Sequence, residues 1–274
     1  MKKTIQYISI IILTLFSISC QDVVDVDLNT APPKLVIDAS INWQKGTSGS
    51  EQKIILTTTT GFYSDIIPVV HGATVYVTNS TNTIFNFIEN ATTGEYICSN
   101  FIPVLNENYT LTVVSNGQTY TASETLKSVV PIDHIVQKND GGFSGKDIEI
   151  KAFFNDPIDE TNYYMYKYNY SNVIKSDYNV REDAFFQGNQ FFSISRNREL
   201  TAGYQVEITH FGISKTYFNY MNVLLSISGS QGGSPFQTPS ATVRGNIINT
   251  TNFDNYALGY FRLSETDTKN YIVQ

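Results

Sequence analysis

Between Lys34 and Lys127 the sequence alternates short runs of β-forming residues with turn signals, and this pattern constrains the fold more than any other feature. In runs such as Tyr109–Val114, apolar and polar side chains alternate, as in a strand with one buried face. Asn116-Gly117 predicts a type I′ hairpin, because both residue types tolerate positive φ. Seven such runs indicate an immunoglobulin-like β-sandwich. The predicted strands are Leu35–Ile41, Lys53–Thr59, Ala73–Thr78, Ile84–Ile88, Glu95–Cys98, Tyr109–Val114 and Gln118–Ser123.

After a break at Val129-Val130-Pro131, the sequence indicates a second β-rich domain with one helix. The aromatic run Tyr163–Tyr170 places four tyrosines on one face of a strand, where a packing surface is favoured over a ligand platform. Ser214 is expected to cap a helix near 214–227, which we expect to plug one end of a β-structure. Further strands are predicted at Ile148–Ala152, Phe191–Ser195, Tyr204–Phe211, Val243–Ile248 and Ala257–Leu263.

We therefore predict an all-β protein, with an immunoglobulin-like β-sandwich at 34–128 and a second β-sandwich or barrel-like domain at 129–274. The composition agrees, since 18 Tyr and 17 Phe accompany only 16% charged residues. The 18 basic and 25 acidic residues give a net charge of −7. This acidic balance disfavours a nucleic-acid partner, because binding to phosphates relies on clustered Lys and Arg.

The first residues have the layout of a secretory signal peptide, predicted here for residues 1–19. Lys2 and Lys3 precede the uncharged apolar run Ile5–Ile18, which is shorter than the roughly 20 residues that span a bilayer. Cleavage is expected between Ser19 and Cys20. Ordinary signal peptidase and lipoprotein processing both fit this site, although lipoprotein signals mostly have Leu where this chain has Ser17.

Lipid attachment to Cys20 is the favoured alternative, because a cysteine directly after a small residue is what lipoprotein processing requires. A diacylglycerol thioether on Cys20, with further acylation, would hold the protein on a membrane without any protein surface in contact with lipid. Residues 20–33 then form an acidic tether ending in Pro32-Pro33. Apart from this covalent lipid, no cofactor is expected.

No pattern in the sequence predicts catalysis, and no catalytic residue is assigned. His71, His134 and His210 lie far apart without a second ligand at metal-binding spacing. Cys98 is expected to be a buried, inert thiol.

Two weaker hypotheses concern acidic residues. Asp156, Asp159 and Glu160 are a weak candidate for Ca²⁺, with a solvated turn favoured. The same three residues together with Glu207 supply the candidates if the protein is a glycan hydrolase.

Eight short motifs follow one another along the chain behind Cys20 and its acids. They are Pro33-Lys34-Leu35-Val36-Ile37, Gly72-Ala73-x-Val75, Gly94-x-Tyr96, Tyr109-x-Leu111, Val130-Pro131-Ile132-Asp133, Asp156-Pro157, Gly245-Asn246-Ile247 and Leu258-Gly259-Tyr260-Phe261. Their order resembles a Bacteroidetes outer-membrane lipoprotein family, the domain of unknown function 4249 family. The resemblance implies an outer-membrane lipoprotein, often encoded beside a TonB-dependent receptor, with no catalytic residues to carry over.

In that phylum, an acidic stretch after the lipidated cysteine resembles a signal for export to the cell surface. Asp22, Asp25 and Asp27 match it loosely, since Val23-Val24 interrupts the cluster. We expect a lipid-anchored protein of the outer membrane that faces the cell surface, with a periplasmic orientation as the alternative. The expected function is a non-enzymatic accessory or binding protein that partners a TonB-dependent receptor in nutrient uptake. A surface glycan hydrolase and a structural or adhesive envelope module are the other hypotheses.

Replacing Cys20 with Ala tests the anchor. The thioether cannot form on Ala, so the variant should lose acylation and move from the membrane fraction to the soluble fraction. Mass spectrometry of the mature N-terminus and membrane fractionation measure both changes. Retention of a non-acylated variant in the membrane fraction would refute the assignment.

Overall fold

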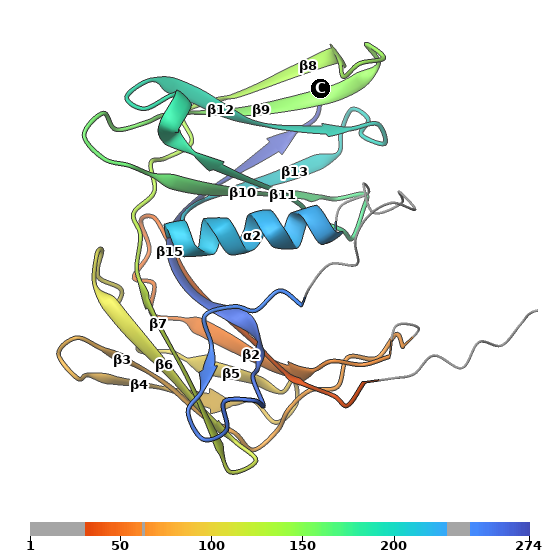
Figure 1. Cartoon of the computed structure of the whole chain (residues 1–274). Helices are drawn as coiled ribbons and strands as arrows, with labels where there is room; N and C mark the ends of the chain where they lie inside the picture. Colours follow the sequence, from red (N-terminus) through yellow and green to blue (C-terminus); the bar gives the residue numbers. More distant parts are fainter. Residues whose placement is uncertain (1–30, 62–63, 229–241) are drawn as a thin grey trace, which may run out of the picture. The chain divides into compact units, whose positions relative to one another are not determined.

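The structure is a computed structural model that describes residues 31–61, 64–228 and 242–274. The chain divides into the units Met1–Pro32 and Pro33–Gln274, and the fold below is that of the second unit (Figure 1). The predicted signal peptide, Ser19, Cys20 and the acids Asp22, Asp25 and Asp27 lie outside the described residues.

All seven strands predicted in the first half form. Asn116 and Gly117 have φ values of 49° and 72°, which confirms the type I′ hairpin. The strands are β1 (Leu35–Gln44), β2 (Gln52–Thr58), β3 (Thr74–Asn79), β4 (Ile84–Glu89), β5 (Glu95–Cys98), β6 (Asn108–Ser115) and β7 (Gln118–Thr125).

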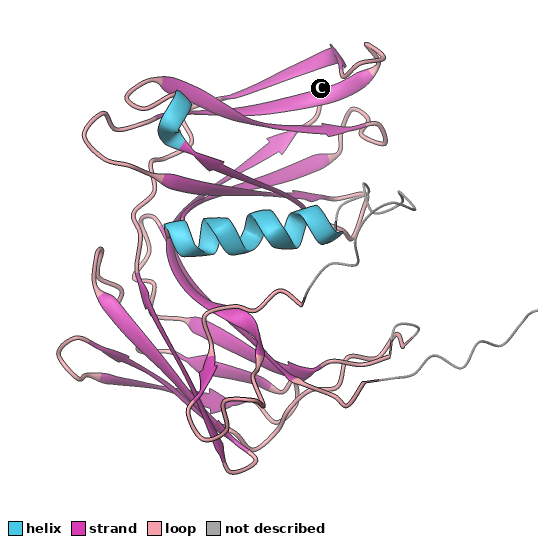
Figure 2. Ribbon diagram, viewed as in Figure 1, coloured by secondary structure: helices cyan, strands magenta, loops and turns pink. Residues whose placement is uncertain are grey.

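The second half is also mostly β and contains the predicted helix, so the fold class is confirmed (Figure 2). Ser214 accepts a hydrogen bond from the Tyr217 backbone N–H at 3.2 Å, as expected of a helix cap. The elements are β8 (Ile135–Gly141), β9 (Asp147–Asn155), β10 (Tyr163–Tyr170), β11 (Asp177–Glu182), the 3₁₀ turn η1 (Asp183–Phe185), β12 (Gln190–Asn197), β13 (Gln205–Gly212), α2 (Lys215–Ser228), β14 (Ile248–Asn249) and β15 (Leu258–Ile272).

The predicted strand Val243–Ile248 is wrong for most of its length, because within it only Ile248 belongs to a strand. Asn246 explains the difference. Its side-chain amide donates to the Phe261 carbonyl at 2.8 Å and accepts the Phe261 N–H at 2.9 Å. Hydrogen bonds of the Asn246 side chain thus take the place of the backbone hydrogen bonds that a regular strand would have made here.

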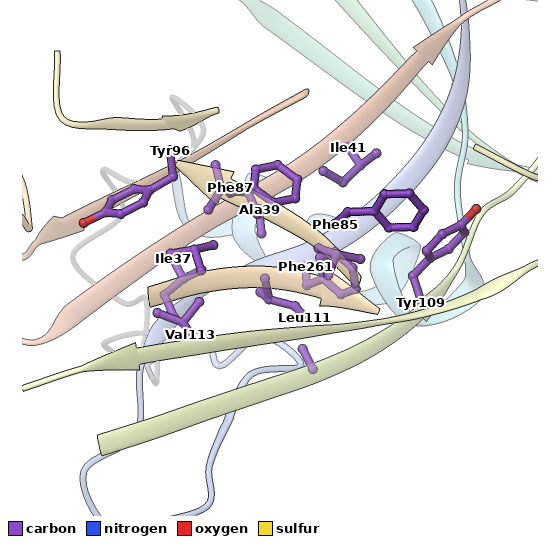
Figure 3. Close-up of a cluster of buried hydrophobic side chains, with 14 of the residues drawn as sticks. Ile37, Ala39, Ile41, Phe85, Phe87, Tyr96, Tyr109, Leu111, Val113 and Phe261 are labelled. Carbon is purple, nitrogen blue, oxygen red and sulfur yellow. The ribbon is translucent and has the colours of Figure 1, made fainter. Parts of the chain in front are cut away.

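The first sandwich has its core between two layers of strands. β1, β2 and β5 form one layer, and β3, β6 and β7 the other. β4 pairs with both β5 and β3, so the sheet is continuous around one side. The inward side chains include Ile37 of β1, Phe85 of β4, Leu111 of β6 and Phe261 of β15 (Figure 3). Each is at most 2% exposed, so this cluster provides the main hydrophobic stabilisation of the first half.

In the second sandwich the sheet β12-β9-β8 faces β11-β10-β13-β15. Tyr164, Tyr166, Tyr168 and Tyr170 all point from β10 into this core, where Phe154 of β9 meets them. The tyrosine ladder is therefore a packing surface, as the sequence favoured. Burial raises the pKa of the Tyr164, Tyr168 and Tyr170 hydroxyls far above the ordinary value.

β15 belongs to both halves. Its first part pairs in parallel with β1, and its last part pairs antiparallel with β13. Phe261 and Leu263 of β15 consequently lie in the first core, whereas Val273, directly after β15, lies in the second. The division into domains at 34–128 and 129–274 stays a prediction, but part of the later segment completes the hydrophobic cluster of the earlier one.

The close approach of β15 to β1 requires glycine at position 259. Gly259 has a φ of +94°, and a Cβ there would lie 2.1 Å from the Ile37 carbonyl oxygen.

Gly203 has a φ of +91° with nothing within 4 Å of an added Cβ. Gly203→Ala should therefore cost about 1–3 kcal/mol of unfolding free energy through backbone strain alone. Gly259→Ala should cost about 1–3 kcal/mol more through overpacking.

Chemical denaturation of the two alanine variants measures this difference. Equal losses would show that the contact with Ile37 relaxes at no cost.

Candidate functional site

A cleft of about 1060 Å³ is lined by described residues of both sandwiches and of helix α2. One wall comes from the outward face of β1 and β2, and another from β10, β11 and β12. Helix α2 supplies a third, and β15 contributes a residue between them. The lining residues are Asp38, Ser40, Asn42, Lys53, Ile55, Met165, Lys167, Lys175, Ser176, Asp177, Tyr178, Asn179, Ile194, Ser195, Arg196, Phe211, Tyr217, Met221, Leu224, Leu225, Ser228 and Arg262.

Helix α2 lies across the outer face of the sheet rather than plugging one end of a β-structure, which corrects our expectation. Tyr217 and Met221 pack on Met165, Phe211 and Tyr260. These partners come from β10, β13 and β15, so the helix covers the region where β15 passes from one sandwich to the other (Figure 1).

The start of α2 is fixed to the first sandwich. Ser214 donates a hydrogen bond to the Glu124 carboxylate of β7 at 2.8 Å. A carboxylate at a helix N-terminus also interacts favourably with the helix dipole. The apolar cleft wall that follows, from Tyr217 to Leu225, is thereby held in place.

Arg262 of β15 lines the cleft although only 7% of the residue is exposed. Its Nη1 donates to Asn42 Oδ1 at 2.9 Å and to Ser264 Oγ at 3.0 Å. Its Cζ lies 4.9 Å from the Phe211 ring centre and 5.4 Å from that of Tyr217, within the range of cation–π interactions. Burial raises the pKa of the Tyr217 hydroxyl, and the neighbouring Arg262 cation opposes that rise.

Basic side chains outnumber acidic ones around the cleft. Lys53 pairs with Glu95 at 2.7 Å, and Arg196 pairs with Glu149 at the same distance. Burial raises the pKa of Glu149, but hydrogen bonds from Arg196 and Lys151 outweigh it and hold that pKa below the usual range. Lys167 and Lys175 form no ion pair with a described residue. The cleft is thus a cationic region of an acidic protein.

The carboxylates considered for Ca²⁺ do not form a metal site in the described part of the chain. Asp156 is buried and accepts hydrogen bonds from the Tyr164 hydroxyl at 2.6 Å and the Gly188 N–H at 3.0 Å. Burial raises its pKa, and these two bonds oppose the rise. Asp159 and Glu160 are exposed.

The carboxylates considered for hydrolysis are also separated. Glu207 accepts a hydrogen bond from Asn169 at 2.8 Å, on the face of β10 opposite to Tyr164. Because Asp156 binds Tyr164 from the core side, the sheet lies between Asp156 and Glu207.

The three histidines are dispersed. His71 is exposed, with Nδ1 2.6 Å from Glu89, and His134 stacks on Phe153 with ring centres 4.5 Å apart. His210 is fully buried and stacks on Tyr166, with ring centres 4.1 Å apart. Neither ring nitrogen of His210 has a hydrogen-bond partner of good geometry among the described residues.

Cys98 is buried, as predicted, and burial raises the pKa of its thiol, which disfavours the reactive thiolate.

None of the cleft residues was singled out from the sequence as a cleft residue. One signal was present, because Arg262 interrupts the otherwise apolar sequence Tyr260-Phe261-Arg262-Leu263 near the end of the predicted strand Ala257–Leu263. An arginine in a strand that reads as buried on both faces is unusual and requires partners.

Fold and cleft together define a class: a mostly-β protein whose two sandwiches share one strand beside a ligand-sized cleft. Residues 21–270 match the family described as "Domain of unknown function (DUF4249)", and the chain belongs to this family. No curated protein matches the sequence. Among the residues that the structure describes, no helix is both long and apolar enough to cross a bilayer.

Two solved structures are similar at low sequence identity. A two-domain fibronectin type III segment from chicken tenascin is 10% identical, with 66% of this chain and 90% of that chain covered and a TM-score of 0.22. A cytokine receptor complex is 8% identical, with 67% and 86% covered and a TM-score of 0.25.

Buried His210 should make the protein sensitive to acid. Burial lowers its pKa to about 3, whereas an unfolded histidine has a pKa of about 6.5. Between these values only the unfolded chain binds the proton, so stability is present above about pH 6.5 and falls as the pH falls. From pH 7 to pH 5 this group alone should cost about 2 kcal/mol of unfolding free energy.

His210→Phe keeps the aromatic stacking and removes the titration, so it should lose about 2 kcal/mol less than the wild type over this range. Denaturant unfolding at the two pH values measures it, with exposed His134→Phe as the control. If wild type and His210→Phe lose the same stability, His210 does not titrate in this way.

Proposed function

We propose that the protein is a lipid-anchored binding protein of the outer membrane that holds a small ligand in the cleft and works with a TonB-dependent receptor in nutrient uptake. The cleft carries this proposal. Its volume of about 1060 Å³ is at the upper end of the range for small-molecule sites, and its lining combines apolar and aromatic side chains with a few charged groups.

The anchor in this proposal is Cys20. The basic residues Lys2 and Lys3, the apolar run and the small residues before Cys20 support it. Two or three acyl chains give stable membrane attachment, since each buried methylene contributes about 0.8 kcal/mol. If fully extended, the predicted tether residues 21–33 would span up to roughly 40 Å. This length lets the folded unit reach a neighbouring membrane protein.

The receptor follows from what a surface binding protein must do next. A ligand captured outside the outer membrane still has to cross it, which requires a channel-forming partner. A TonB-dependent receptor is such a partner, and the resemblance to a lipoprotein family often encoded beside these receptors supports the choice. Asp22, Asp25 and Asp27 support an orientation toward the cell surface.

Co-purification tests the proposal. The tagged full-length protein is chemically cross-linked in intact cells, and membranes are then extracted in mild detergent. A β-barrel receptor should be enriched with the wild type and lost with Cys20→Ala, which has the same folded unit but no anchor. Mass spectrometry identifies the partner. Repeated isolation of the acylated protein without any barrel protein would contradict the proposal.

A further inference from the structure

Arg262 is a buried cation whose described partners are all neutral. Asn42 and Ser264 accept its hydrogen bonds, and Phe211 and Tyr217 pack against its guanidinium. We infer that Arg262 recognises the anionic group of the ligand, and that this ligand is an organic anion with an apolar or aromatic body. The inference rests on the proposed function of the cleft as a binding site.

Arg196, the other arginine that lines the cleft, has a carboxylate partner, whereas Arg262 has none within the described part of the chain. The Arg196 side chain is 50% exposed, yet its Nε donates to the Glu149 carboxylate at 2.7 Å. Outside the cleft, Arg198 has a side chain 75% exposed and pairs with Asp147 at 2.9 Å. No carboxylate of the described residues lies within 4 Å of the Arg262 guanidinium. Arg181 and Arg244 also form no ion pair with a described residue, but both are exposed, so Arg262 is the buried arginine that lacks a counter-charge.

The hydrogen bonds of Arg262 define what is missing. Nε is buried without a hydrogen-bond partner among the described residues, both bonds of good geometry come from Nη1, and the remaining polar neighbour of the guanidinium is the neutral Tyr217 hydroxyl. A buried charge without a counter-charge costs several kcal/mol, and neutral dipoles recover only part of that cost. A ligand carboxylate at the guanidinium would supply the missing charge, because guanidinium–carboxylate hydrogen bonds are among the strongest in proteins.

Asp38 is the acidic residue that would argue against this inference if it supplied the counter-charge of Arg262. It lines the same cleft from β1, but it lies beyond 4 Å from Arg262, and its Oδ1 accepts the Ser40 hydroxyl at 2.7 Å. The other cleft acid, Asp177, accepts the Tyr170 hydroxyl at 2.8 Å. Both carboxylates thus have polar partners of their own.

The rest of the lining indicates what the anion is attached to. Tyr217, Met221, Leu224 and Leu225 lie on one face of α2 and give the cleft an apolar wall that begins beside Arg262. Lys167, near the Tyr178 ring at 6.0 Å, and Lys175 add positive charge to another wall. A ligand with an anionic end and an apolar body matches this arrangement.

The test uses two probes that differ only in charge, 2-naphthoate and its neutral amide 2-naphthamide. Calorimetric titration of the full mature chain in detergent should give a Kd for the carboxylate at least tenfold lower than for the amide. Arg262→Met, which keeps the length and apolar stem, should reduce this ratio to about one. Arg262→Lys keeps the positive charge but lacks the planar guanidinium, so it should retain part of the difference in Kd between the two probes. Arg198→Met is the matched control and should leave the ratio unchanged.

Thermal unfolding without a probe separates recognition from a purely structural role. Because Arg262→Met removes an uncompensated charge, its unfolding midpoint should equal or exceed that of the wild type. A midpoint below that of the wild type would assign Arg262 to stability and overturn the inference. Equal affinity for the two probes, binding of neither, or a ratio that survives in Arg262→Met would overturn it as well.

The outcome is independent of the co-purification result. A charge-selective cleft in a protein that captures no receptor would leave the anion site standing and remove the transport role. A receptor complex formed by a protein without charge selectivity would support the transport role and overturn the anion site.

Discussion

The pairing of β15 with both β1 and β13 is the constraint on which the rest of the described fold depends. A parallel pair cannot be closed by a tight turn, so nearly the whole chain lies between β1 and its partner. Acidic residues of β15 also hold the segment that passes between the sandwiches. Glu265 accepts the Val129 N–H at 2.9 Å, and Asp267 accepts the Ile132 N–H at 2.8 Å. The two hydrophobic cores are thereby joined through backbone and carboxylate hydrogen bonds rather than a free linker.

Burial of β15 on two faces follows from this position. Phe261 and Leu263 fill the first core, while Tyr260 and Arg262 face α2 and the cleft. Strands covered on both faces normally carry continuous apolar residues, because each polar group there must find a partner. Arg262 departs from that pattern at the place where the cleft meets the strand. The local cost is tolerable because the pairing on each side of β15 is extensive.

The strands and the helix that could be predicted from the sequence are those whose own residues carry a local pattern. The seven strands of the first half, β10 and α2 each carry their own signal: alternation, an Asn-Gly turn or a capped apolar stripe. β8 and β11 lie at sheet edges and carry few apolar residues, so their sequences lack that signal. The polar sequence of Ser264–Lys269 likewise hides the length of β15. The cleft could not be predicted, because Asn42, Lys167, Tyr217 and Arg262 meet only through non-local pairing.

The same non-local assembly lets an acidic protein present a cationic cleft. At physiological salt the Debye length is about 8 Å, so the net charge of −7 is screened over most of the surface. Arg262, Lys167 and Lys175 line the cleft without an ion-pair partner among the described residues, and beside an apolar wall their charge is screened less than on the open surface. In the proposed site, charge would select the ligand, and contact with α2 would add apolar burial to the binding free energy. A ligand lacking either its anionic group or its apolar body would lose one of these two contributions.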